Sequence, residues 1–334
     1  MLTLQNVHAH YRTVHGEVSA VDGVSLTVHE NEILGIAGES GCGKSSLLKV
    51  LYGYIEPPLM LESGELHAET EVDGQLVRYD ATTLRNAWWR FISYVPQGSM
   101  SVLSPVTRID KQFFDAVTRS HSAKDKAQVQ TQIEQYLKEL ELPVEVLRSY
   151  PHQLSGGMRQ RVLVALATFL HPRIILADEP TTALDVVVQR GILTMLMRVQ
   201  ERNRSSLVLV SHDMGVHYQI THRMAIMYAG KVVETGPTND IFTNPLHPYT
   251  QMLVDSLPRI GDVGQRKGIA GRPPSLLNPP QRCRFADRCP HAMDVCREHT
   301  PPLTEVKPGH FAACFLHDAV VAEHERNTTT EGTA

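Results

Sequence analysis

Four short segments carry the residue types that bind and cleave a phosphoanhydride, and their spacing fits one domain. They are GESGCGKS (38–45), LSGGMRQR (154–161), IILADEP (174–180) and SHD (211–213). A nucleoside triphosphatase contains such parts, namely glycine-rich turns, an acidic strand end and a downstream histidine. Their order predicts an ATP-driven switch.

The first segment predicts a phosphate-binding loop. Its glycines free the backbone to curl around an anion, Lys44 would reach the β- and γ-phosphates, and the Ser45 hydroxyl would ligate Mg²⁺. Residues 32–37 (EILGIA) predict a buried strand before the loop and Lys44–Leu51 predicts a helix after it. The loop predicts ATP or GTP binding by these residues: Gly38, Glu39, Ser40, Gly41, Cys42, Gly43, Lys44, Ser45 and Ser46.

The acidic pair follows an apolar run, which places it at the carboxyl end of a strand, where ligands of open α/β sheets bind. We expect Asp178 to hold Mg²⁺ through water and Glu179 to orient or deprotonate the attacking water. The alternative is two solvated carboxylates that cap a strand.

The LSGGMRQR segment predicts a second anion-binding helix start. Ser155, Gly156 and Gly157 would open a helix over 158–170 and expose a hydroxyl and backbone amides. Since one phosphate loop already serves one nucleotide, a second site suggests a γ-phosphate bound across a dimer interface. A plain N-cap is the alternative for Ser155.

The elements between these segments predict an α/β fold. Residues 173–177 and 206–210 fit parallel strands separated by a helix over 186–202. Residues 97–170 show helical periodicity, as in 124–142, and residues 224–236 predict a hairpin.

Composition limits the functional classes. A chain of 334 residues fits two unequal domains, and 42% hydrophobic residues, 20% charged residues and a net charge of -4 disfavour nucleic-acid binding. No apolar run approaches the roughly 20 residues of a membrane-spanning helix, and the first residues lack a secretory signal pattern. We therefore expect a cytoplasmic protein.

Four of the five cysteines cluster near the end of the chain, whereas Cys42 is expected to fill space in the phosphate loop. In a reducing compartment such a cluster suggests a metal site. The gaps of five, six and seventeen residues are wider than in most zinc sites and favour a four-iron four-sulfur cluster, with zinc or metal-free thiols as alternatives. The predicted ligands are Cys283, Cys289, Cys296 and Cys314.

Over residues 2–240 these motifs resemble the Walker A, signature and Walker B sequences of ABC transporter ATP-binding subunits. The resemblance implies a P-loop parallel-sheet core, an antiparallel β subdomain and a helical subdomain at about 98–170. It makes Gln97 the Q-loop glutamine, a Mg²⁺ ligand and part of the catalytic set. It makes Asp185 the D-loop aspartate, His212 the catalytic switch histidine and Tyr11 the aromatic that stacks on adenine, although a core role for Tyr11 is equally compatible with its position.

The resemblance also implies a head-to-tail pair of such subunits. Each nucleotide would lie between one chain's phosphate loop and the other chain's signature helix. ATP binding would close the pair, and hydrolysis would reopen it.

Residues 244–258 (NPLHPYTQMLVDSLP) and 283–290 (CRFADRCP) resemble the C-terminal extension of oligopeptide/dipeptide importer ATPases. This divides the chain into an ATP-binding domain (1–240) and a four-cysteine module (241–317). The polar composition of the remaining residues (318–334) predicts a disordered tail. The resemblance also favours the iron–sulfur cluster. The implied partners are two membrane permeases, a second and different ATPase chain, and indirectly an extracytoplasmic binding protein, at the cytoplasmic face of the inner membrane.

One stretch departs from the family pattern. QGSMSVLSP (97–105) stands where that family has a sequence resembling QDPMTSLNP, at the expected permease contact, so the solute stays open between peptides, sugars and metal chelates. Residues 62–90 give no functional signal. The alternatives to an importer are a soluble ABC-type ATPase that remodels nucleic acid or ribosomes, and an iron–sulfur redox sensor that uses ATP.

Overall fold

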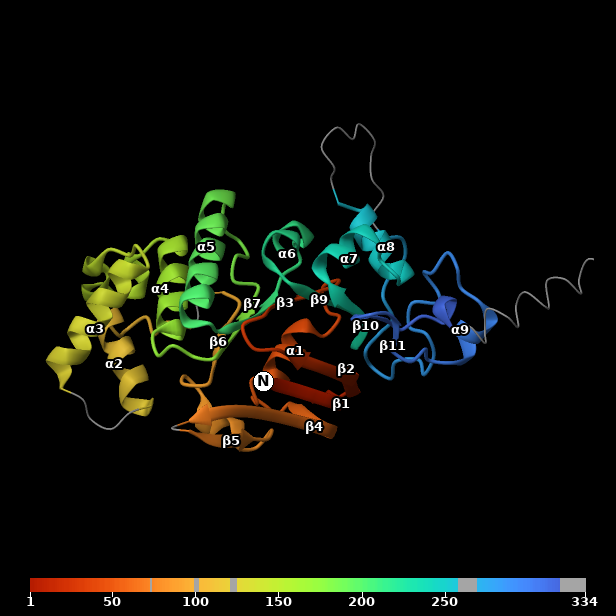
Figure 1. Cartoon of the computed structure of the whole chain (residues 1–334), viewed down its shortest axis with the longest axis horizontal. Coiled ribbons are helices and arrows are strands. Elements are labelled where there is room, and N and C mark those ends of the chain that lie inside the picture. Colours follow the sequence, from red (N-terminus) through yellow and green to blue (C-terminus); the bar gives the residue numbers. More distant parts are fainter. Residues whose placement is uncertain (73, 99–101, 121–124, 258–268, 319–334) are drawn as a thin grey trace, which may run out of the picture.

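An eight-stranded sheet forms the centre of the computed structural model, and its middle strands are parallel (Figure 1). The order is β11-β12-β10-β9-β3-β8-β7-β6, in which the strands from β9 to β6 run parallel. The predicted strands 32–37, 173–177 and 206–210 are confirmed within one residue. The parallel strands are β3 (Ile33–Ala37), β6 (Ile92–Val95), β7 (Ile174–Asp178), β8 (Ser206–Val210) and β9 (Arg223–Tyr228).

The structure describes residues 1–72, 74–98, 102–120, 125–257 and 269–318. Several sequence-based expectations therefore lie partly or wholly outside the described residues. They include the tail beyond Asp318, residues 99–101 of the segment after Gln97, the start of the predicted 124–142 helix and Pro258 at the end of the 244–258 segment.

Helices cover both faces of the sheet. The strands are buried on each side, and in β8 Leu207 and Leu209 face one hydrophobic cluster while Val208 and Val210 face the other. Helix α1 (Lys44–Leu51) fills the second cluster, and α5 (Val186–Asn203) and α6 (Met214–Ile220) fill the first. No helix within the described ranges is long and apolar enough to cross a membrane.

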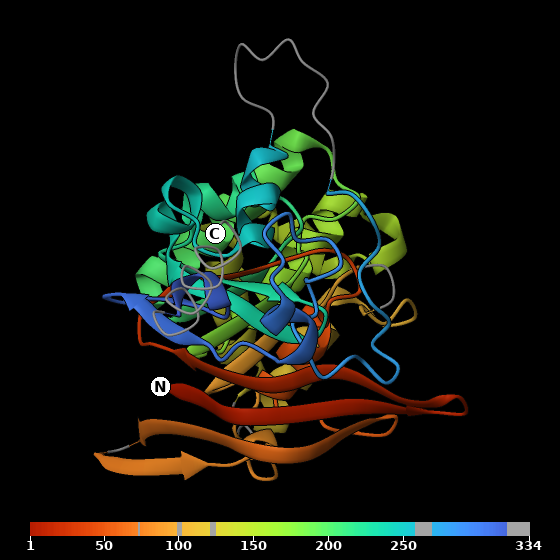
Figure 2. The same ribbon diagram turned by 90° about the vertical axis from the view of Figure 1, so that its right-hand side faces the viewer.

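A separate antiparallel sheet lies along one side of the molecule, as Figure 2 shows, and its strands share a hydrophobic cluster with α1. Its order is β2-β1-β4-β5, and it includes most of the segment 62–90 that gave no functional signal. Beyond its last strand, Trp88 stacks on Tyr52 with ring centroids 4.4 Å apart. The strands are β1 (Leu2–Thr13), β2 (Gly16–Val28), β4 (Leu59–Val72) and β5 (Gln75–Tyr79), followed by a 3-10 turn (Leu84–Ala87).

The helical subdomain packs beside α5 at the β6 edge of the sheet (Figure 1). Its helices α2 (Ile109–Ser120), α3 (Lys126–Glu139) and α4 (Gly156–Thr168) and two 3-10 turns (Val144–Arg148, Pro151–Gln153) fall inside the predicted helical interval. The predicted 158–170 helix begins two residues earlier, because Ser155 is the N-cap.

The C-terminal segment extends the main sheet. The predicted 224–236 hairpin is confirmed as β9 and β10 (Lys231–Pro237), and β12 (His310–Ala312) pairs with β10 and with β11 (Thr304–Lys307). The remaining elements are α7 (Thr238–Thr243), α8 (Pro248–Asp255), α9 (Asp294–Glu298) and a 3-10 turn (Phe315–His317). The segment is therefore continuous with the α/β core.

Candidate functional site

The predicted phosphate loop lies between β3 and α1 and has backbone geometry that requires glycine. Gly38 and Gly43 have φ values of 149° and 107°, and a Cβ on them would lie 2.2 and 2.0 Å from backbone oxygens of Met227 and Ala20. The Lys44 ammonium donates to the backbone oxygens of Gly38 at 2.8 Å and Glu39 at 2.9 Å. The loop thus curls around the amine that would meet a phosphate. Cys42 is buried, and burial raises the pKa of its thiol.

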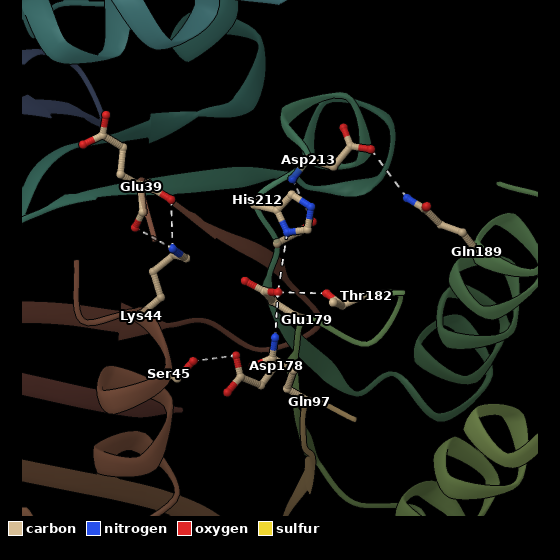
Figure 3. Close-up of polar contacts among 12 residues, drawn as sticks. Glu39, Lys44, Ser45, Gln97, Asp178, Glu179, Thr182, Gln189, His212 and Asp213 are labelled. Atoms are coloured by element: carbon tan, nitrogen blue, oxygen red, sulfur yellow. Dashed lines mark hydrogen bonds and ion pairs between the residues drawn. The ribbon is translucent and has the colours of Figure 1, made fainter. Parts of the chain in front are cut away.

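Asp178 ends β7 and faces the first turn of α1 (Figure 3). Its carboxylate accepts hydrogen bonds from Ser45 Oγ at 3.0 Å and from the Tyr94 hydroxyl at 2.8 Å. Burial raises the pKa of Asp178 above its ordinary value. Hard oxygen donors beside a desolvated carboxylate fit a Mg²⁺ ion, which would relieve that electrostatic cost.

Glu179 is the meeting point of three further polar residues, as Figure 3 shows. Its Oε2 accepts hydrogen bonds from Gln97 Nε2 at 3.0 Å and Thr182 Oγ1 at 2.8 Å, and His212 Nδ1 lies 3.5 Å away. Because β8 and β7 are neighbouring parallel strands, His212 and Glu179 emerge at one edge of the sheet. The arrangement can place one carboxylate oxygen against a water molecule.

Lys44, Ser45, Gln97, Glu179 and His212 border one cavity of about 450 Å³, whereas Asp178 contacts Ser45 without lining it. The Tyr11 hydroxyl, at its antiparallel-sheet side, accepts a hydrogen bond from Ser46 Oγ at 3.2 Å. The structure therefore brings the phosphate loop, Gln97, Glu179, His212 and Tyr11 together. The lining comprises Tyr11, Val18, Ala20, Ser40, Gly41, Gly43, Lys44, Ser45, Ser46, Gln97, Glu179, His212 and Leu276.

Sequence reasoning missed several of the residues at this site. Tyr94 lies three residues before Gln97 and Thr182 three residues after Glu179, and their hydroxyls could have been noted as partners for the two carboxylates. Val18 and Ala20 gave only a strand-like alternation, and Leu276 gave no signal because it is more than 200 residues from the phosphate loop in sequence.

The second predicted anion site lies outside this cavity. Ser155 Oγ caps α4 by accepting from Met158 N at 3.2 Å, and Asp185 caps α5 by accepting from Val188 N at 3.0 Å. A Cβ on Gly157 would lie 2.5 Å from Val188 Cγ1, so the two helix starts pack closely together. Neither Ser155, Gly156, Gly157 nor Asp185 lines the nucleotide cavity of its own chain.

The four C-terminal thiols are neighbours, but the structure does not support the predicted cluster. Burial, with smaller contributions from the other thiols, raises the pKa of Cys283 to about 11 and of Cys314 to about 12. Their chemistry suits a soft metal. However, no three His, Cys, Asp or Glu side chains among the described residues are close enough to hold a metal ion. The four-iron four-sulfur cluster therefore stays a prediction from the cysteine spacing and the family resemblance.

The C-terminal segment contacts the phosphate loop directly. The Arg288 guanidinium donates to both carboxylate oxygens of Glu39, at 2.7 and 2.8 Å, and the Glu39 amide donates to the Tyr249 hydroxyl at 2.9 Å. Arg284 similarly pairs with Asp22 of β2. No sequence motif predicted these contacts.

Comparison with known protein families gives two matches along the chain. Residues 21–182 match the family described as ABC transporter, and residues 233–296 match the family described as oligopeptide/dipeptide transporter, C-terminal region. The first match includes the phosphate loop and Glu179, and the second includes Tyr249 and Arg288.

Similar curated proteins cover nearly the whole chain. The dipeptide transport ATP-binding protein DppD of Lactococcus lactis subsp. cremoris is 39% identical, over 95% of this chain and 91% of its own length. DppD of Bacillus subtilis is 38% identical over 97% and 96%, and the oligopeptide transport ATP-binding protein OppD of Salmonella typhimurium is 36% identical over 94% and 93%.

Solved structures share the fold. The ATP-binding cassette MJ0796, described as dimeric in a post-hydrolysis state with ADP and Pi, is 27% identical with a TM-score of 0.61, over 71% of this chain and 99% of its own. The cbiO1 structure from Clostridium perfringens, at 21% identity and a TM-score of 0.58, covers 73% and 90% and is similar in fold alone.

Proposed function

Because this chain belongs to the ATP-binding subunits of ABC transporters of the oligopeptide/dipeptide type, we propose that it hydrolyses ATP to drive peptide uptake. The observation that carries this proposal is that Lys44, Ser45 and Glu179 line one cavity, with Asp178 hydrogen-bonded to Ser45 beside it. Peptide is the substrate class of the named relatives. We propose that this chain's importer also takes peptides.

Each half of the cavity has a separate task in this proposal. The loop amides and Lys44 would hold the β- and γ-phosphates, while Ser45, Gln97 and Asp178 would hold Mg²⁺, which would supply positive charge to the phosphates. Tyr11 stacks on the base. Glu179 accepts a proton from the attacking water at a carboxylate oxygen, and Gln97, Thr182 and His212 keep that oxygen in position.

The site of one chain requires a second chain. Ser155, Gly156, Gly157 and Asp185 lie outside the cavity, at two exposed helix starts that pack together. We propose that they meet the γ-phosphate held by a second ATPase subunit, which is a different chain in the arrangement implied by the family. Two permeases and, indirectly, an extracytoplasmic binding protein complete the importer, with this subunit bound peripherally at the cytoplasmic membrane face.

The proposed domain division is 1–240 for the ATPase and 241–317 for the C-terminal module. Within the module we propose that Cys283, Cys289, Cys296 and Cys314 are the ligands of a four-iron four-sulfur cluster. The mutual effect of the thiols on their pKa values supports their proximity. Iron and acid-labile sulfide assays on the anaerobically purified chain, compared with a Cys289→Ser variant, test this. Equal and negligible iron in both would exclude the cluster.

Affinity purification of the tagged chain from gently solubilised native membranes, without oxygen, tests the importer. Mass spectrometry should identify two permeases and a second ATPase, and the accompanying binding protein can then be screened with peptides, sugars and metal chelates. Recovery of only ribosomal or nucleic-acid-binding proteins would instead support the remodelling ATPase.

A further inference from the structure

A short piece of the C-terminal segment lies along the edge of the antiparallel sheet, beside the nucleotide cavity. The Ser19 amide donates to the Leu276 oxygen at 2.8 Å, and Val18 and Leu277 form an antiparallel bridge. Because β2 is an edge strand of its sheet, this pairing covers backbone groups that would otherwise be open. Residues 276–277 therefore have a fixed position next to β2.

The two leucines of this piece have different surroundings. Leu276 lines the nucleotide cavity. Leu277 instead packs on the backbone of Gly16, because a Cβ added to Gly16 would lie 3.1 Å from Leu277 Cδ1. Both side chains are partly buried. One residue is thus placed to touch a ligand and its neighbour is placed to anchor the segment.

The cavity has an apolar wall and a polar end. Tyr11 and Val18 are paired across β1 and β2, and Ala20 follows Val18 at the two-residue period that returns to the same strand face. Leu276 extends this wall from a third, adjacent backbone segment. The other lining residues are glycines or carry polar side chains.

We propose that Leu276 contacts the nucleoside end of the bound nucleotide and is a determinant of its affinity. This rests on the proposed ATP function. The phosphates require the glycine loop and Lys44, so the flat base must lie on the apolar wall that Tyr11, Val18 and Leu276 share. The C-terminal module thereby supplies part of the nucleotide site. An aliphatic contact makes no hydrogen bond to a base edge, so it strengthens ATP and GTP binding alike.

The test compares ATP with inorganic tripolyphosphate, which has the phosphates but no base. We expect Leu276→Ala to weaken ATP binding about tenfold, the equivalent of about 1.4 kcal/mol, with tripolyphosphate binding unchanged. Leu303→Ala, the matched control, truncates a partly buried leucine of the same C-terminal segment that does not line the cavity, and it should change neither affinity. Calorimetry on the full-length chain measures all of these affinities. Parental ATP affinity in Leu276→Ala, or an equal loss for both probes, would overturn the proposal.

A second variant gives an optical readout. The emission of Leu276→Trp should change on addition of ATP and stay constant with tripolyphosphate, whereas equal responses or no response to ATP would contradict the contact. If the unmodified chain binds tripolyphosphate but not ATP, the proposed ATP function is wrong. If the unmodified chain binds ATP and the Leu276 variants respond as it does, only the proposed Leu276 contact is wrong.

Discussion

The nucleotide cavity and the junction of the C-terminal segment with the sheet both depend on charged side chains, but they expose them differently. At the cavity Glu179 and His212 are 18% and 67% exposed. At the junction Glu234 and His310 are 0% and 1% exposed, and Glu234 also accepts the amides of Leu246 and His247 at 2.8 Å. Glu179 and His212 thus keep some exposure, although Lys44 and Asp178 beside them are buried, whereas the pair that attaches one segment to another is sealed from solvent.

This difference predicts that a substitution at the cavity changes ATP turnover, whereas a substitution at the junction changes the free energy of unfolding. Glu179→Gln should lower ATP turnover by about 1,000-fold, within the range for loss of a general base, with little change in ATP affinity or unfolding. Phosphate release, calorimetry and thermal unfolding measure the three quantities. The exposed Glu145→Gln variant is the control, and hydrolysis by Glu179→Gln at the parental rate would remove the catalytic assignment.

The sealed junction should show the opposite behaviour. His310→Ala leaves the buried Glu234 carboxylate without its imidazole partner, at a cost of about 3 kcal/mol in the free energy of unfolding. Urea unfolding measures this loss, and ATP turnover should fall only in proportion to the unfolded fraction. His299→Ala, at an exposed histidine of the same module, should change neither property. Equal stability of the two variants would mean that the junction does not hold the module.

The same contrast explains what could be predicted from sequence. The phosphate loop, Asp178, Glu179 and His212 sit in local motifs, where neighbouring residues determine both chemistry and strand position, so their convergence followed from parallel-sheet topology. The pairing of Arg288 with Glu39 and of His310 with Glu234 spans 249 and 76 residues, and no local pattern specifies a partner at that distance. The four cysteines were visible as a cluster, but spacing alone did not determine the separation of their sulfur atoms.

Acid should lower the free energy of unfolding through two buried histidines, His217 and His247. Burial lowers the pKa of His217 and of His247 to about 4, from 6.5. The unfolded chain therefore binds more protons than the folded chain between these values, so stability is full above pH 6.5 and falls as pH drops toward 4. We expect a loss of about 2 kcal/mol per histidine between pH 7 and pH 5, measured by urea unfolding. A flat profile would contradict their burial as neutral groups.

The smallest expected effect lies where the two regions meet, at the contact of Arg288 with Glu39. The guanidinium also donates to the Tyr228 hydroxyl at 3.1 Å and to the Ala270 oxygen at 2.8 Å. These two hydrogen bonds hold it in the orientation in which it contacts Glu39. Arg288→Ala should weaken ATP binding about fivefold, the equivalent of about 1 kcal/mol, because Glu39 then moves more freely beside the oxygen that Lys44 contacts.

The double variant with Glu39→Ala should bind no more weakly than either single variant, since both remove one interaction. Arg282→Ala, which breaks a comparable pair with Asp287 away from the loop, is the matched control. Additive losses would mean that Arg288 acts on ATP binding by a route other than the phosphate loop.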